Sequence, residues 1–402
     1  MLPLMGLFIA GSLLLRKTRW PIFQVQYTYF WLAGLTLILL GALIHSYLLY
    51  EAISQWALLN KFCGWFVLCA YFLMGAWFVR NLPMETIAHF FKIAVLFFLA
   101  VFCICSIPLF LHYIHIIKNP GIFEFPVAGM MANKNAFIFL FLSFFCLSNL
   151  MPRDRFWNKA VLIFWILAPL AYALTFARAG LLIFPVLVLF LWLLKADIPW
   201  KKSLLALAFS SSFLLTFNWM GNNNILNISP VDGLTPSRNG VLQDVKKIIT
   251  LPVSTEEKTA PKNIRYGGDR MRINIILTSL DAIKDHPFIG AGLGSASIYQ
   301  QQQWGKFINI IDCTPLWLWA ETGCIGLIAF LGFYFTCLVT LWKNSAKASL
   351  DPYTRSVLKA VLMIMIAFGG MCLLHEILYT RFLWLFMGMA LGLQVRQARH
   401  QD

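Results

Sequence analysis

The feature that most constrains the fold is a series of long, unbroken apolar runs covering most of the 402 residues. A helix needs about 20 apolar residues to span a bilayer, and only helices or closed barrels satisfy the backbone in lipid. Runs of this length favour helices. The sequence predicts an all-α polytopic membrane protein with about eleven transmembrane helices. The predicted spans are 2–15, 27–50, 62–79, 93–116, 135–151, 158–174, 179–194, 203–219, 314–342, 356–375 and 382–395.

Composition agrees with a bilayer protein and argues against a nucleic-acid partner. Charged residues make up 12% of the chain, whereas soluble domains carry about 25%. The net charge of +15 is better explained by basic residues that set topology in short loops. The nine cysteines lie mainly in apolar runs, without CxxC spacing or a histidine at ligand distance, and predict no metal site.

Successive short loops are alternately rich and poor in basic residues. The basic residues of these two groups of loops are called here the rich set and the poor set. The positive-inside rule makes the rich set cytoplasmic, so the long segment 220–312 faces outside. The rich set is Arg16, Lys17, Arg19, Arg80, Lys92, Arg153, Arg155, Lys159, Lys195, Lys201, Lys202, Lys343, Lys347, Arg355, Lys359, Arg396 and Arg399, and the poor set is Lys61, Lys118, Lys134, Arg178 and Arg381. We expect an N-terminal bundle of about eight helices (1–219), an external loop region between helices 8 and 9 (220–312), and a C-terminal bundle of about three helices with a short cytoplasmic tail (313–402).

Four polar motifs join this loop on the outer side, and such convergence indicates a site. They are GMMANKNA (129–136), TFARAG (175–180), DCTPLWLWAETG (312–323) and HEILYTR (375–381). Asn135 and Arg381 are supporting candidates. Arg178 interrupts an apolar stretch, where a charge is usually functional; the alternative is an interfacial loop residue.

A cluster of arginines opens the second half of the long loop. Arg265, Arg270 and Arg272 precede an amphipathic segment at 273–283. Arginine suits phosphate because its planar fork donates two parallel hydrogen bonds and stays charged. The alternative is a solvated basic helix start, balanced by acidic neighbours. The run GAGLG (290–294) either presents backbone N–H groups to a phosphate or forms a tight turn back to the membrane.

Three further residues are candidates for proton chemistry or for its support. Asp312 either accepts a proton from an attacking hydroxyl or is a helix N-cap. Glu321 lies deeper and is expected to pair or hydrogen-bond within the bundle. His375 is either a base or a structural histidine.

Taken together, these ordered motifs resemble the O-antigen ligase and polymerase family of bacterial envelope glycosyltransferases. The resemblance covers roughly residues 120–395 and is strongest from 270 to 330, where KDHPFIGAGLG precedes AETGCIGL by about thirty residues. It implies a GT-C-like fold in the inner membrane with a periplasmic site. It also implies an undecaprenyl diphosphate-linked donor, with no nucleotide sugar, cofactor or metal.

By the family pattern, Arg178 and Arg272 match the arginines that hold the diphosphate. The family usually has His-Asn about nine residues before the glutamate of the AETG-like motif, and here Asp312 and Cys313 stand there. Either Asp312 replaces the histidine as the base, or the chain is inactive. The resemblance favours a ligase that uses the lipid A core as acceptor. The alternatives are a polymerase that uses a carrier-linked repeat, a transporter of lipid-linked glycan, and an inactive envelope scaffold.

Overall fold

The computed structural model describes residues 26–51, 53–113, 134–175, 178–194, 196–222, 269–298, 311, 313–346 and 350–399. Within these ranges the chain is helical and contains no β-strand, as predicted. The helices are α2 (Gln26–Tyr50), the π-helix η2 (Ala57–Phe62), α3 (Cys63–Asn81), α4 (Met84–Tyr113), α6 (Lys134–Leu150), α7 (Arg155–Thr175), α8 (Arg178–Leu193), α9 (Trp200–Asn222), α11 (Asp269–Asp285), α13 (Thr314–Ser345), α14 (Pro352–Leu374) and α15 (Arg381–Arg399).

Each predicted span overlaps a described helix, apart from 2–15, which lies outside the described residues. By length and composition, five of the helical segments in the described part of the chain are long and apolar enough to cross a membrane. They are Phe30–Tyr50, Ala57–Asn81, Met84–Ile104, Thr314–Ser345 and Pro352–Leu374. Shorter apolar helices accompany them at Phe137–Leu150, Phe156–Ala171, Leu182–Leu193 and Arg381–Leu393. The chain is therefore a multi-pass membrane protein, while the count of eleven and the GT-C arrangement stay predictions.

Most of the described basic residues that were predicted in loops lie inside helices, and Lys61 and Lys92 are two of them. Lys61 belongs to η2, and Lys92 lies in α4, which begins at Met84 rather than near residue 93. The predicted spans 62–79 and 93–116 both begin too late, because they include only the apolar run. Polar residues in the first turns do not end a helix. Lys92 is accommodated at the surface, where its Nζ lies 3.0 Å from Asp154 Oδ2.

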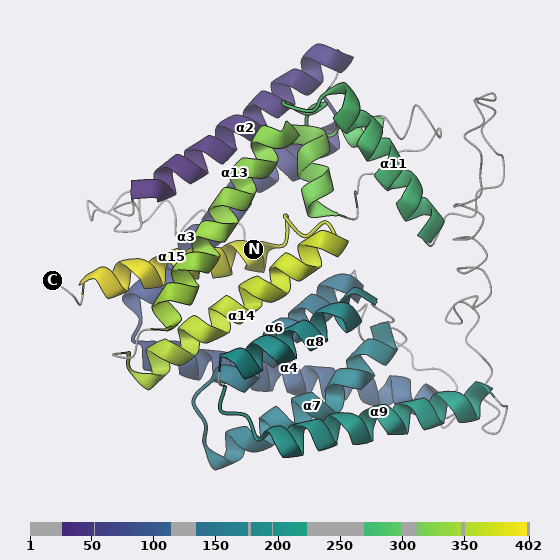
Figure 1. Cartoon of the computed structure of the whole chain (residues 1–402), viewed down its shortest axis with the longest axis vertical. Helices are drawn as coiled ribbons and strands as arrows, with labels where there is room; N and C mark the ends of the chain where they lie inside the picture. Colours follow the sequence, from purple (N-terminus) through teal and green to yellow (C-terminus); the bar gives the residue numbers. More distant parts are fainter. Residues whose placement is uncertain are drawn as a thin grey trace.

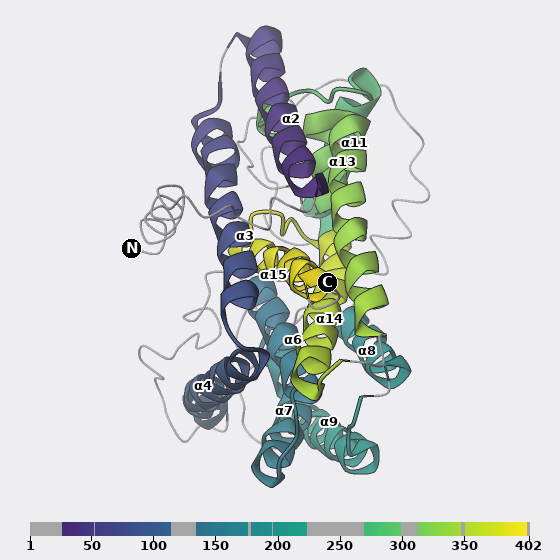
Figure 2. The same ribbon diagram turned by 90° about the vertical axis from the view of Figure 1, so that its left-hand side faces the viewer.

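Helix α14 is the central element. It contacts α13 and α15 on one side and α4, α6 and α8 on the other. Figure 1 shows α2, α3, α13 and α15 on one side of α14, and α4, α6, α7, α8 and α9 on the other. In the most apolar stretch of α14, 67% of the residues are buried, whereas the share is 28–39% in the other four candidate spans. The N-terminal helices α2 and α3 thus pack beside the C-terminal helices, as Figure 2 also shows.

Glycines bring α3 and α15 into direct backbone contact. A Cβ added at Gly388 would lie 1.8 Å from Phe72 O, and one at Gly75 would lie 1.9 Å from Leu385 O. Small residues of this kind let membrane helices approach closely. The close pair α3–α15 therefore depends on positions that accept no side chain.

Replacing Gly388 by alanine is expected to force α3 and α15 apart and to lower the free energy of unfolding by about 1–3 kcal/mol, the usual cost of overpacking. Gly41→Ala is the matched control, since a Cβ there has no atom within 4 Å. Thermal unfolding in detergent measures both. Equal stability of the two variants would contradict the assigned packing.

Candidate functional site

Helix α13 is broken at Gly323, and a distant segment occupies the break. Gly323 has φ 71° and ψ −178°, a conformation that is essentially confined to glycine. The break separates residues 314–322 from 324–345. The freed N–H of Cys324 donates to Pro287 O (3.0 Å), and Ala320 O accepts from the N–H of Ala291 (2.8 Å). The span predicted at 314–342 corresponds to α13 and to the candidate membrane span Thr314–Ser345, and the structure adds this kink inside it.

Residues 286–294, here called the glycine-rich segment, supply these bonds. Gly290, Gly292 and Gly294 all have positive φ. A Cβ on Gly290 would lie 2.5 Å from the backbone of Glu321 and Gly323, and one on Gly292 would lie 2.5 Å from Ser46 N. The segment therefore lies directly on the backbones of α13 and α2.

The backbone N–H groups of the glycine-rich segment bond to the protein itself. Gly290 donates to His286 O, Ala291 to Ala320 O and Leu293 to Ala42 O. The N–H of Gly294 donates to Glu321 Oε2 at 2.9 Å. The interpretation of GAGLG as a phosphate-binding run is therefore wrong for these four groups. The alternative, a tight turn that returns the chain to the membrane bundle, is correct.

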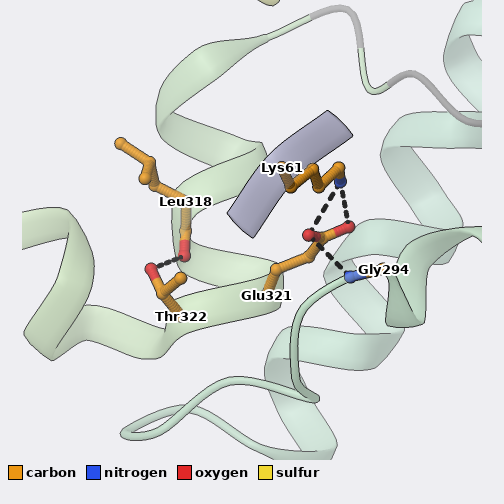
Figure 3. A network of polar contacts seen from close by, with 5 residues as sticks. All are labelled: Lys61, Gly294, Leu318, Glu321 and Thr322. Atoms are coloured by element: carbon orange, nitrogen blue, oxygen red, sulfur yellow. Dashed lines mark hydrogen bonds and ion pairs between the residues drawn. The ribbon is translucent and has the colours of Figure 1, made fainter. Parts of the chain in front are cut away.

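Glu321 forms a buried ion pair with Lys61, as Figure 3 shows. The Lys61 Nζ lies 2.7 Å from Oε1 and 2.8 Å from Oε2. The Lys61 side chain is 3% exposed and that of Glu321 is 0% exposed. The Nζ also lies 4.7 Å from the centroid of the Trp317 ring. The expectation that Glu321 pairs within the bundle is confirmed.

Sequence reasoning missed Lys61. The charge pattern places it in an outer loop, but it lies in the π-helical turn between residue 56 and α3. Such turns occur often at functional sites. A usable signal was present: Lys61 stands alone in the run WALLNKFCGWF, and Glu321 stands alone in LWLWAETGCIGL. Two single, opposite charges in apolar helices are each costly to bury unless they meet.

The start of α13 is tied to the turn that carries His375. The Thr314 hydroxyl donates to His375 O at 2.9 Å and accepts from the N–H of Ile377 at 3.0 Å. His375 is buried and is the C-cap of α14, with its N–H donating to Met371 O. Thr314, which follows Asp312 by two residues, is thus bonded to the segment that carries His375.

The N-cap of α13 is Cys313. Asp312, for which a helix N-cap is the alternative interpretation, lies outside the described residues. Burial raises the pKa of the Cys313 thiol, so it stays protonated and is a poor nucleophile. Burial, together with the Glu376 and Glu321 carboxylates, raises the pKa of the Tyr379 phenol well above its usual value, so this group stays protonated.

The predicted phosphate-binding residues stand at helix starts. Arg178 is the first residue of α8, and Arg270 and Arg272 lie in the first turn of α11. Asn135 lies in the first turn of α6, and Arg381 is the exposed first residue of α15. For Arg178, Arg270, Arg272 and Asn135 the structure describes the backbone only, and Arg265 lies outside the described residues.

Helix α11 has the predicted amphipathic character. Ile275, Ala282 and Ile283 are buried, and the helix contacts α13. Leu277, on the other face, is 54% exposed. The helix with Arg270 and Arg272 at its start is thus packed on the helix that carries Glu321.

A side chain at Gly323 is expected to undo the docking of the glycine-rich segment. In Gly323→Ala the new Cβ would lie 2.0 Å from Phe288 O, and the positive φ adds about 1–2 kcal/mol of backbone cost. We expect a lower unfolding temperature in detergent. Gly64→Ala is the control, because its nearest neighbour lies at 3.7 Å; an unchanged Gly323→Ala protein would argue against the break.

Comparison with known families gives a match over part of the chain. Residues 161–331 match the family model described as O-Antigen ligase. The match runs from α7 to α13 and includes Arg178, Arg272 and Glu321. No curated protein matches the chain. Over this segment, the chain is similar to the O-antigen ligase family, and the match supports the resemblance seen in the sequence motifs.

Proposed function

We propose that this protein transfers a glycan from an undecaprenyl diphosphate carrier to an acceptor hydroxyl at the periplasmic face of the inner membrane, with the lipid A core as acceptor. The observation that carries the proposal is the family match over residues 161–331. This segment holds both arginine-bearing helix starts and the half of α13 that carries Glu321. The region 220–312 would admit the donor and the acceptor.

The helix starts suit a diphosphate. A helix N-terminus carries about half a positive charge and unpaired N–H groups, and arginine adds a full charge with two parallel donors. The diphosphate gathers negative charge as the sugar leaves it. Donors fixed in a site with little water stabilise that charge strongly. Arg178 and Arg272 are assigned this role, with Arg270 and Arg265 in support.

The chemistry then needs one proton acceptor. The acceptor oxygen forms a bond to the anomeric carbon, the bond from that carbon to the diphosphate oxygen breaks, and the hydroxyl proton passes to the base. The carrier leaves as the free diphosphate, and the anomeric configuration inverts. Asp312 and His375 are the candidate bases. The hydrogen bond from Thr314 to His375 O supports this assignment because it joins their two segments.

Deletion of the gene in its native host tests the proposal. A ligase predicts loss of all long-chain lipopolysaccharide, together with accumulation of carrier-linked polymer. A single repeat unit on the lipid A core would instead assign the protein as a polymerase. Unchanged surface glycans would contradict both assignments. Accumulation of lipid-linked glycan in vesicles without a covalent product would favour a transporter.

A further inference from the structure

Three segments far apart in the sequence meet at the Glu321 carboxylate. Lys61 comes from η2, Gly294 ends the glycine-rich segment, and Glu321 itself lies in the short first half of α13. Lys61 and Glu321 are 260 residues apart, and Lys61 lies outside the family-matched segment 161–331. The Lys61–Glu321–Gly294 cluster therefore joins the N-terminal part of the chain to the arginine-bearing part.

The cluster holds one end of α11. The glycine-rich segment follows α11 directly, and the N–H of His286 still donates to Ala282 O in its last turn. Beyond it, Pro287 O and Ala291 N are bonded at the α13 break, and Gly294 is bonded to Glu321. A segment bonded at both places leaves the end of α11 little freedom to tilt.

A small tilt at that end becomes a large displacement at the other. Helix α11 has 17 residues, which makes it about 25 Å long at 1.5 Å per residue. A rotation of about 10° at Asp285 moves the first turn by about 4 Å over this length. A misplacement of about 1 Å in a catalytic group can already cost about a hundredfold in rate.

We propose that Lys61 and Glu321 are positioning residues, which fix the orientation of α11 through Gly294 and thereby set Arg272 against the donor diphosphate. This inference rests on the proposed function. A buried ion pair gains little stability over apolar residues of the same volume, but it can specify one arrangement. Here the carboxylate accepts three hydrogen bonds, two from Lys61 and one from Gly294. An apolar pair would fill the same space without directing Gly294.

Two double variants of the full chain in nanodiscs separate positioning from simple packing. Lys61→Met with Glu321→Met removes both charges and the acceptor for Gly294. Lys61→Gln with Glu321→Gln removes the charges but keeps an amide oxygen for Gly294. For Met/Met we expect binding of undecaprenyl diphosphate to weaken by about 10- to 100-fold, with backbone amide exchange accelerated over 269–294 and unchanged in α14. Gln/Gln should fall between Met/Met and the wild type in both measurements.

Wild-type affinity in the Met/Met variant, or unchanged exchange over 269–294, would overturn the inference. So would a Gln/Gln variant that is as impaired as Met/Met. If the Met/Met variant does not fold, the Gln/Gln variant decides. Its backbone amide exchange at 287–294 is expected to be several-fold faster than in the wild type. Unchanged exchange would contradict the inference. Wild-type protein that binds no undecaprenyl diphosphate would sink the proposed function instead, and the exchange data would still report whether the cluster orients α11.

Discussion

Replacing Arg272 by alanine is expected to lower glycan transfer by at least about a hundredfold, the usual effect of losing one preorganised donor to a developing anion. Arg178→Ala is expected to have an effect of the same order. In both variants the diphosphate loses a bidentate, permanently charged partner as the sugar departs. Arg272→Lys keeps the charge without the planar fork and should restore only part of the activity.

Lys284→Ala is the matched control for Arg272. It removes a positive charge from the same helix, but the Lys284 side chain is 77% exposed and lies 3.7 Å from Asp281. Transfer is measured by gel analysis of lipopolysaccharide in cells that carry each variant at equal protein level. Normal transfer by both Arg178→Ala and Arg272→Ala would refute the proposed role of the arginines.

The second large effect is on stability. Lys61→Ala leaves Glu321 buried and unpaired, and breaking a buried ion pair in this way costs about 3–5 kcal/mol of unfolding free energy. The control is Lys92→Ala. Lys92 also pairs with a carboxylate, but its side chain is 18% exposed and that of Asp154 is 56% exposed. Pairs of this kind contribute about 0–1 kcal/mol.

Denaturant or thermal unfolding in the same detergent compares the two lysine variants. We expect Lys61→Ala to unfold well before Lys92→Ala. Two curves that coincide would mean that the buried pair contributes no more than the surface pair. The assigned burial of Lys61 and Glu321 would then be wrong.

The membrane helices can be predicted from the sequence because each carries its own apolar run. The amphipathic segment before GAGLG was readable for a similar reason, since a helical period places Ile275, Ala282 and Ile283 on one face. Glu321 was also foreseen as paired, because a lone carboxylate in an apolar helix requires a partner. In all three cases the deciding information is local.

The partner of Glu321 cannot be predicted from the sequence, because pairing over 260 residues depends on how the helices pack. The break at Gly323 was hidden for the same reason. A single glycine within a helical pattern is usually tolerated, and here it is the docking of Pro287 and Phe288 that completes the hydrogen bonds of the break. The glycines of GAGLG predicted a tight turn, but only the fold shows that α2 and α13 lie against them.

The most direct test of the account is transfer by the purified protein. The full chain in nanodiscs is supplied with an undecaprenyl diphosphate-linked glycan and lipid A core, and products are followed by mass spectrometry. The account predicts a glycosylated core and one released undecaprenyl diphosphate per glycan transferred, with neither product formed by the Arg178→Ala/Arg272→Ala double variant. Folded wild-type protein that releases no diphosphate and forms no glycosylated core, or a double variant that works as well as wild type, would contradict it.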